Sequence, residues 1–244
     1  MLSKSQVKYI QSLGHKKSRD EERMFIAEGP KIVEDFLWNG SVRIKEIYAV
    51  KNWLDGNKKN TDSIELIEIT EQELERLSLL KTPNQVLAVV EKFEMPYEIE
   101  LKNKLSIALD TIQDPGNLGT IIRIADWFGI KNIICSNDCA DMYNGKVVQA
   151  TMGSIARVNI FYKELLPWLK EHDSIKIYAT ALNGNAINDF GKIKEGIIII
   201  GNESKGINDS ILEIADEKIS IPRIGDAESL NAAVATGIIL SHLV

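Results

Sequence analysis

The chain contains few cysteines and histidines and no long apolar run. It has two cysteines and three histidines in 244 residues, and its longest uncharged apolar stretch covers only residues 196–201. Cys135 and Cys139 cannot form a disulfide framework, so we expect reduced thiols and a cytoplasmic protein. No histidine or second cysteine pair stands near them, so we expect no metal site. The apolar stretch excludes a membrane span, and no apolar run follows the first charges, so we expect no signal peptide.

The chain also lacks an excess of positive charge. It has 29 basic and 35 acidic side chains and a net charge of −6, which weakly disfavours a nucleic-acid partner. Charge acts locally, however, and residues 1–19 contain basic side chains and no acidic one. This segment is either a solvated helix face or a phosphate-binding edge. Its basic residues are Lys4, Lys8, Lys16, Lys17 and Arg19.

The order of apolar runs and turn residues predicts two α/β modules. Helical and strand-like patterns alternate over residues 20–92, and a charged segment with Pro96 follows them. We expect Ser3 to cap a helix through Ser12, and Thr70 to cap a helix over Glu71–Leu80 with Glu73 at the capping-box position. Stronger apolar runs come next, which is typical of a parallel sheet covered by helices on both faces. They are residues 105–109, 130–134, 175–180 and 196–200. We therefore predict a first domain at 1–95, a linker at 96–104 and a second domain at 105–244.

Ligands of parallel α/β sheets bind at the carboxyl ends of the strands, so the loops after these runs are the candidate sites. The first loop, 110–119, contains Pro115 and two glycines, which predict a tight turn leading into a helix with Arg123. An arginine beside a helix start suits a phosphate. A turn with a surface salt bridge explains the same residues equally well.

The other two loops carry polar residues but few proton acceptors. Residues 201–206 are rich in glycine yet match neither the Walker nor the dinucleotide fingerprint. We expect Gly201 to let a ligand approach the backbone closely, and an ordinary strand-to-helix turn is the alternative. Residues 219–231 precede a helix of small residues, and we expect Ser229 to cap this helix. Either this loop forms part of a ligand site, or its residues only cap a core helix. No histidine lies near these loops, which argues against a Ser–His–Asp triad.

Taken together, the three loops resemble a known family. The motifs are Asp114-Pro115-x-Asn117-x-Gly119-x-x-x-Arg123, then Gly201-x-Glu203-x-x-Gly206, then Ile221-Pro222-x-x-Gly225-x-x-x-Ser229-Leu230-Asn231. In this order they are similar to those of the SpoU (TrmH-like) RNA ribose methyltransferases of the SPOUT superfamily. Residues 25–29 and 82–89 resemble the L30e-like substrate-binding domain that often precedes the catalytic domain.

The resemblance implies methyl transfer from S-adenosylmethionine to a ribose 2′-hydroxyl in structured RNA, with rRNA favoured over tRNA. It also implies a deep trefoil knot in the second domain and an active site formed in a homodimer. From its local positive charge, we predict that the basic residues of segment 1–19 contribute to RNA binding. The catalytic residues carried over are Arg123, Asn117, Glu203, Ser229 and Asn231. The cofactor-binding residues carried over are Thr180, Ala181, Leu182, Gly201, Ile221, Ser229, Leu230 and Asn231. Alternative hypotheses are a catalytically silent RNA-binding relative and a Rossmann-like nucleotide-dependent enzyme acting on small molecules.

Overall fold

The computed structural model describes residues 2–57 and 64–244 and divides the chain into two units. One unit comprises residues 1–94 together with 143–156, and the other comprises 95–142 together with 157–244. The sequence analysis assigned residues 143–156 to the second domain, whereas their contacts are with the first unit. The Tyr143 ring explains this grouping, because its centroid lies 4.9 Å from that of Phe25 and 6.0 Å from that of Phe93.

The first unit is built on a mixed four-stranded sheet of order β1-β4-β2-β3. Strand β4 pairs antiparallel with both β1 and β2, and β2 pairs parallel with β3. The strand bounds are β1 (Met24–Glu28), β2 (Ile44–Ala49), β3 (Glu65–Glu68) and β4 (Val86–Glu91). Apolar residues of β1, β2 and β4 are buried together with Ile10 and Leu13 of the N-terminal segment, which packs on the sheet.

Short helices accompany this sheet. They are α1 (Lys4–Ser12), α2 (Lys16–Glu22), α3 (Pro30–Trp38), α4 (Lys51–Asn57), α5 (Glu71–Leu77), α7 (Gly145–Thr151) and the 3₁₀ turn η2 (Ser154–Ala156). Thr70 and Glu73 form the predicted capping box of α5. This helix ends at Leu77 rather than at the predicted Leu80, because Ser78 is extended and its hydroxyl donates to the buried Glu28 carboxylate.

The second unit holds an all-parallel six-stranded sheet of order β10-β8-β9-β5-β6-β7. Its strands are β5 (Leu105–Leu109), β6 (Asn132–Ser136), β7 (Asn159–Lys163), β8 (Ile177–Ala186), β9 (Gly196–Ile200) and β10 (Glu217–Ser220). The four predicted apolar runs contribute to β5, β6, β8 and β9, and β9 is buried along its whole length. Strands β7 and β10 were not predicted. The sheet confirms the predicted parallel α/β architecture.

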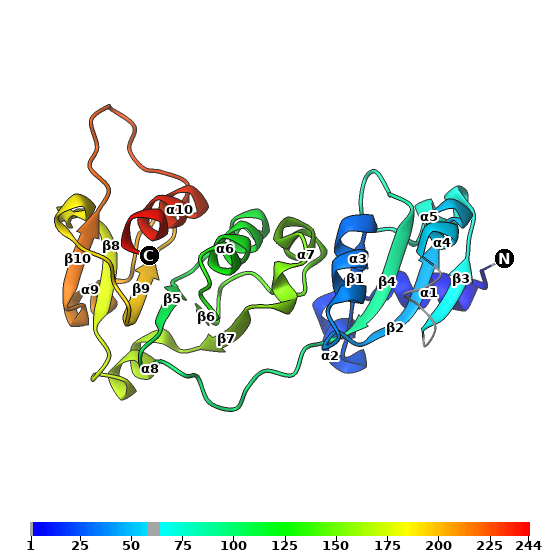
Figure 1. The fold of residues 1–244 in the computed structure, drawn as a ribbon, viewed down its shortest axis with the longest axis horizontal. Coiled ribbons are helices and arrows are strands. Elements are labelled where there is room, and N and C mark those ends of the chain that lie inside the picture. The colour runs from blue at the N-terminus through cyan, green and yellow to red at the C-terminus, as the bar shows by residue number, and fades with distance from the viewer. Residues whose placement is uncertain (1, 58–63) are drawn as a thin grey trace. The chain divides into compact units, whose positions relative to one another are not determined.

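Helices α6 (Pro115–Trp127), α8 (Leu165–Glu171), α9 (Asp209–Ile214) and α10 (Ala232–Leu243), with the 3₁₀ turn η3 (Ile187–Asp189), accompany this sheet. Figure 1 shows α10 beside α6, and the two helices are in contact. The predicted turn at residues 115–119 is wrong, since α6 already begins at Pro115. Asp114 caps the helix by accepting a 2.8 Å hydrogen bond from Asn117 N, and Pro115 suits the first helical turn.

Candidate cofactor and catalytic site

The sheet of the second unit brings the three motif loops to one edge. Strands β10, β8, β9 and β5 are parallel neighbours, so their carboxyl ends meet at the same side of the sheet. The loops after β5, β9 and β10 begin at Asp110, Gly201 and Ile221. This is the arrangement that the sequence analysis expected for a ligand site.

Hydrogen bonds join the loops after β5 and β9. Asp110 Oδ2 accepts a 2.7 Å bond from Asn208 N, and Asn202 Nδ2 donates over 2.9 Å to Thr111 O. Asn202 Oδ1 also accepts from the backbone N–H groups of Ser204 and Lys205. These hydrogen bonds tie the two loops together and give them a defined shape.

Thr111 is a residue that the sequence analysis did not single out. Its φ of 60° is in the left-handed region, which β-branched residues rarely adopt. Ser136 Oγ accepts from Thr111 N over 2.8 Å, and Thr111 Oγ1 donates to Asp138 Oδ2 over 3.0 Å. These contacts come from the end of β6 and hold the strained residue just ahead of the α6 cap. Hydrogen bonds from Ser136 and Thr111 lower the pKa of Asp138.

One side chain from each of the three motifs takes part in a single chain of hydrogen bonds. Asn117 Nδ2 on α6 donates to Glu203 Oε1 after β9, and Asn231 Nδ2 donates to Asn117 Oδ1 over 2.8 Å. Asn231 Oδ1 caps α10 by accepting from Ala233 N and Val234 N at 3.1 and 3.2 Å. Asn231, rather than the expected Ser229, is therefore the N-cap of α10. Three of the predicted catalytic residues meet at this point.

Arg123 is exposed on α6 and lies apart from this hydrogen-bond chain. Six residues separate it from Asn117, which is about 9 Å along a helix axis. Across residues 2–57 and 64–244, the Arg123 guanidinium has no hydrogen-bond or ion-pair partner. The predicted salt bridge is thus not formed in the described part of the chain, and the guanidinium is free to contact an anion.

The predicted cofactor residues Thr180, Ala181 and Leu182 lie where β8 departs from β10. Ala179 is opposite Lys218 and Asn185 is opposite Ile219, so residues 180–184 form an excursion between two paired stretches. Gly184 permits close passage of β10, since a Cβ there would lie 2.6 Å from the Lys218 carbonyl carbon. Leu182 is 79% exposed, which leaves an apolar side chain open at this edge of the sheet.

Gly201 has a different role from the expected one. The sequence analysis predicted that it lets a ligand approach the backbone. In the structure, a Cβ at Gly201 would lie 2.4 Å from the Gly206 carbonyl carbon, so the glycine accommodates its own loop. Asn202 and Gly206 exchange two backbone hydrogen bonds across the same loop, which explains this close approach.

The remaining predicted residues lie in an exposed loop. Residues 222–231 are all exposed, and Figure 1 shows this segment as the long orange loop before α10. Leu230 is 45% exposed, and Ser229 has no hydrogen-bond partner among the described residues. The structure thus unites Asn231 with Asn117 and Glu203 but does not bring Ser229 and Leu230 into contact with them.

A hollow of about 410 Å³ adjoins the hydrogen-bond chain between α6 and α10. Asn117 and Asn231 form its polar end, and apolar or small residues line the rest. These are Thr120, Ile124, Ala233, Val234, Gly237, Ile238 and Ser241. Val234 and Ile238 are half-exposed, so the outer face of α10 presents apolar surface next to the site.

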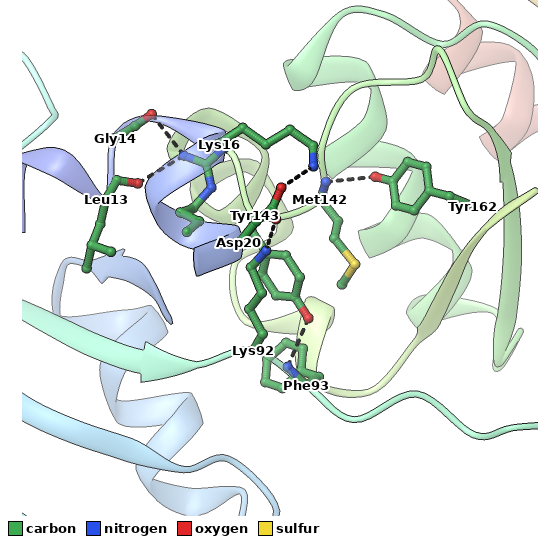
Figure 2. Close-up of polar contacts among 10 residues, drawn as sticks. Leu13, Gly14, Lys16, Asp20, Lys92, Phe93, Met142, Tyr143 and Tyr162 are labelled. Carbon is green, nitrogen blue, oxygen red and sulfur yellow. Dashed lines mark hydrogen bonds and ion pairs between the residues drawn. The ribbon is translucent and has the colours of Figure 1, made fainter. Parts of the chain in front are cut away.

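The basic residues of segment 1–19 have different environments, and Figure 2 shows one of them, Lys16, in contact with Asp20. Arg19 is buried, and its guanidinium donates to Leu13 O and Gly14 O over 2.9 and 2.8 Å. Lys16 pairs with Asp20 at 2.6 Å and Lys17 with Glu21 at 3.8 Å. The expectation of an RNA contact by Arg19 therefore conflicts with its buried position, because its carbonyl contacts close the end of α1.

Replacing Arg19 with alanine is expected to lower the free energy of unfolding by about 2 kcal/mol, since two carbonyls lose a charged donor. The control is Lys17→Ala, whose side chain is 86% exposed and should change stability by less than ~0.5 kcal/mol. Urea unfolding of both variants measures the difference. Equal stability of the two variants would mean that Arg19 is not structural.

Other site types find little support in the described part of the chain. Both cysteines are buried and unpaired. Among residues 2–57 and 64–244, no group of three or more histidine, cysteine or acidic side chains is placed to hold a metal ion. Within the same ranges, no helix has the length and apolar character needed to cross a bilayer.

Comparison with known proteins identifies the family. The sequence profile of the SpoU rRNA Methylase family matches residues 104–241, which is more than half of the chain. The chain belongs to the SpoU rRNA methylase family. The profile of the MRM3-like substrate binding domain matches residues 4–88. The family predicted from the three motifs is confirmed.

Similarity to individual SpoU relatives extends over nearly the whole chain. A Bacillus subtilis (strain 168) protein named 23S rRNA (guanosine(2553)-2'-O)-methyltransferase RlmP is 32% identical over 240 residues, 97% of this chain and 95% of the relative. A solved TrmH-family structure from Porphyromonas gingivalis has a TM-score of 0.86 and 33% identity, covering 99% of this chain and 97% of that one. An AdoMet-bound rRNA methyltransferase from Sinorhizobium meliloti has a TM-score of 0.86 and 32% identity, covering 98% and 94%.

Proposed function

We propose that this chain transfers the methyl group of S-adenosylmethionine to a ribose 2′-hydroxyl of ribosomal RNA. The observation that carries the proposal is the hydrogen-bond chain Glu203–Asn117–Asn231, which links all three family motifs at one sheet edge. The predicted enzyme class and cofactor are confirmed by the family match and by full-length relatives. This match sets aside the Rossmann-like alternative. Ribosomal RNA is favoured because the Bacillus subtilis relative is named for 23S rRNA.

The residues at the carboxyl edge of the sheet fit S-adenosylmethionine. The excursion at 180–184 leaves this part of β8 unpaired with β10, so its peptide groups can face a ligand. The exposed side chains of Leu182 and Leu230 offer apolar surface for a flat base. We therefore assign cofactor binding to Thr180–Leu182, Gly201, Ile221 and Ser229–Asn231, with Gly201 acting through the shape of its loop.

S-adenosylmethionine supplies an electrophilic methyl group when it is bound. The remaining task of the protein is to place the ribose hydroxyl in line with that methyl group and to ease the loss of its proton. Glu203 and Asn231 fix the amide of Asn117, so its orientation is set before RNA arrives. The free guanidinium of Arg123 is cationic and suited to hold a phosphate or the developing alkoxide beside the ribose.

We also propose that the enzyme acts as a homodimer through α6 and α10. The half-exposed Val234 and Ile238 and the small Gly237 support this, because they form an apolar face next to Asn117 and Asn231. Sedimentation equilibrium tests the assembly, and a single species of monomer mass would contradict it. The trefoil knot that the resemblance implies stays a prediction.

Methyl transfer in vitro tests the proposed function. The purified chain is incubated with tritiated S-adenosylmethionine and 23S rRNA, and the RNA is then hydrolysed with alkali. A 2′-O-methyl group blocks alkaline cleavage at that nucleotide, so we expect the label in dinucleotides. Label in mononucleotides would mean base methylation. Absence of label, with intact S-adenosylhomocysteine binding by calorimetry, would favour the catalytically silent relative.

A further inference from the structure

One end of the first unit's sheet gathers four chain segments that are distant in sequence. Gly29 N, just after β1, donates to Val86 O over 2.9 Å, and Val50 N, just after β2, donates to Gln85 O over 2.9 Å. Neighbouring strands lie about 4.8 Å apart, so these three segments lie within about 10 Å. The fourth segment is the start of α7, where a Cβ on Gly145 would lie 4.0 Å from Leu79 Cδ1.

These segments carry positive charge only. Residues 29–33, 50–53, 78–86 and 144–149 each contain one lysine and no aspartate or glutamate. The four side chains are Lys31, Lys51, Lys81 and Lys146, and we call them the basic edge. All four are exposed, and none has an ion-pair partner among the described residues. In a chain of net charge −6, this is a local concentration of unneutralised lysines.

Two carboxylates flank residues 29–33 in the sequence, and both are already engaged. Glu28 precedes Gly29 but is buried, and it accepts from Ser78 Oγ and Leu79 N. Burial raises the pKa of Glu28. Glu34, one turn into α3, accepts from Trp53 Nε1 over 3.1 Å. These contacts leave the lysines available for an external anion.

Exposed amide side chains stand between the lysines. Asn52, Asn84 and Gln85 are exposed and have no side-chain hydrogen-bond partner among the described residues. Gln85 has a φ of 59°, and the 2.9 Å bond from Val50 N to its carbonyl ties it to the end of β2. Free amides can pair with base edges of unstacked RNA, while lysines neutralise its phosphates.

We propose that the basic edge is the principal phosphate-binding surface of the first unit for the RNA substrate. This rests on the proposed function for the identity of the RNA. The surface differs from segment 1–19, where Lys16 and Lys17 have acidic partners and Arg19 is buried. The basic edge also includes Lys146, which lies between β6 and β7 in the sequence but belongs to the first unit.

The test compares three variants of the full chain for binding to 23S rRNA transcribed in vitro, over a range of salt concentrations. The first is Lys31→Ala/Lys51→Ala/Lys81→Ala. The matched control is Lys102→Ala/Lys192→Ala/Lys194→Ala, which removes three exposed lysines near the amino-terminal ends of β5 and β9. The competing variant is Lys4→Ala/Lys8→Ala, which removes the unpaired lysines of segment 1–19.

The basic-edge variant is expected to bind at least ~10-fold more weakly at 0.15 M salt, with a log–log salt slope shallower by about 2. S-adenosylhomocysteine binding and thermal melting should match the wild type. An unchanged slope, or an equal loss in the Lys102/Lys192/Lys194 control, would overturn the proposal. A larger loss of RNA affinity in the Lys4/Lys8 variant would also overturn the proposal, because it would identify segment 1–19 as the principal phosphate-binding surface. A wild type that methylates no RNA refutes the proposed function separately, since binding and salt slope remain measurable.

Discussion

Replacing Arg123 with alanine is expected to lower methyl transfer by at least ~100-fold, because the only unpaired cation on α6 near the motif residues is lost. The proposed cofactor residues lie on β8 and in the loops after β9 and β10, and they do not include Arg123. Binding of S-adenosylhomocysteine should therefore stay unchanged. Arg123 is exposed and has no partner in the described part of the chain, so thermal stability should also be preserved. Single-turnover methyl transfer with 23S rRNA measures the effect.

The conservative variant Arg123→Lys separates two roles of the guanidinium. Lysine keeps the positive charge but loses the planar fork that binds two oxygens of a phosphate at once. Partial recovery of kcat by lysine would indicate charge stabilisation, and no recovery would indicate bidentate positioning. If Arg123→Ala stayed fully active, the catalytic assignment of Arg123 would be wrong.

Replacing Gly201 with alanine is expected to damage both stability and cofactor binding. The added Cβ would lie 2.4 Å from the Gly206 carbonyl carbon and 2.6 Å from its oxygen. These are backbone atoms, so the loop 201–206 must open rather than a side chain rotate. Overpacking of this kind costs about 1–3 kcal/mol or more. We expect a lower melting temperature and S-adenosylhomocysteine affinity reduced at least ~10-fold.

Gly191→Ala is the matched control for this variant. A Cβ at Gly191 meets nothing within 4 Å, and the residue lies in an exposed turn. Its stability should change by less than ~0.5 kcal/mol. Melting curves compare the stability of the two variants, and calorimetry compares their affinity for S-adenosylhomocysteine. Wild-type behaviour of Gly201→Ala would show that the loop tolerates an opening and that its shape does not matter to the cofactor.

Local signals predicted most of the elements, and the errors have local causes as well. The capping residues Ser3 and Thr70 correctly marked the starts of α1 and α5. Proline and glycine at 115–119 favour a turn, but Asp114 and Pro115 also favour the start of a helix. In the structure these residues form the start of α6. For α10, two polar residues competed as caps, and Asn231 rather than Ser229 has its side chain within reach of Ala233 N.

The site was predicted less completely, because its contacts are distant in sequence. The motifs correctly brought Asn117, Glu203 and Asn231 to one edge, since parallel strands end together. The left-handed backbone conformation of Thr111 could not be predicted from the sequence, because contacts with Ser136 and Asp138 impose it. The burial of Arg19 could not be predicted from the sequence either, because its hydrogen-bond acceptors are backbone carbonyls, which every residue possesses. The grouping of residues 143–156 with the first unit depends on Tyr143 meeting Phe25 and Phe93.

A map of ribose methylation in rRNA tests the central claim most directly. Ribosomal RNA from a strain lacking this protein is compared with RNA from the same strain carrying the wild-type chain or Arg123→Ala. Resistance of each nucleotide to alkaline cleavage reports its 2′-O-methyl group. We predict that one ribose loses its methyl group without the protein, regains it with the wild type and stays unmethylated with Arg123→Ala. Identical maps in all strains, or full restoration by Arg123→Ala, would contradict the account.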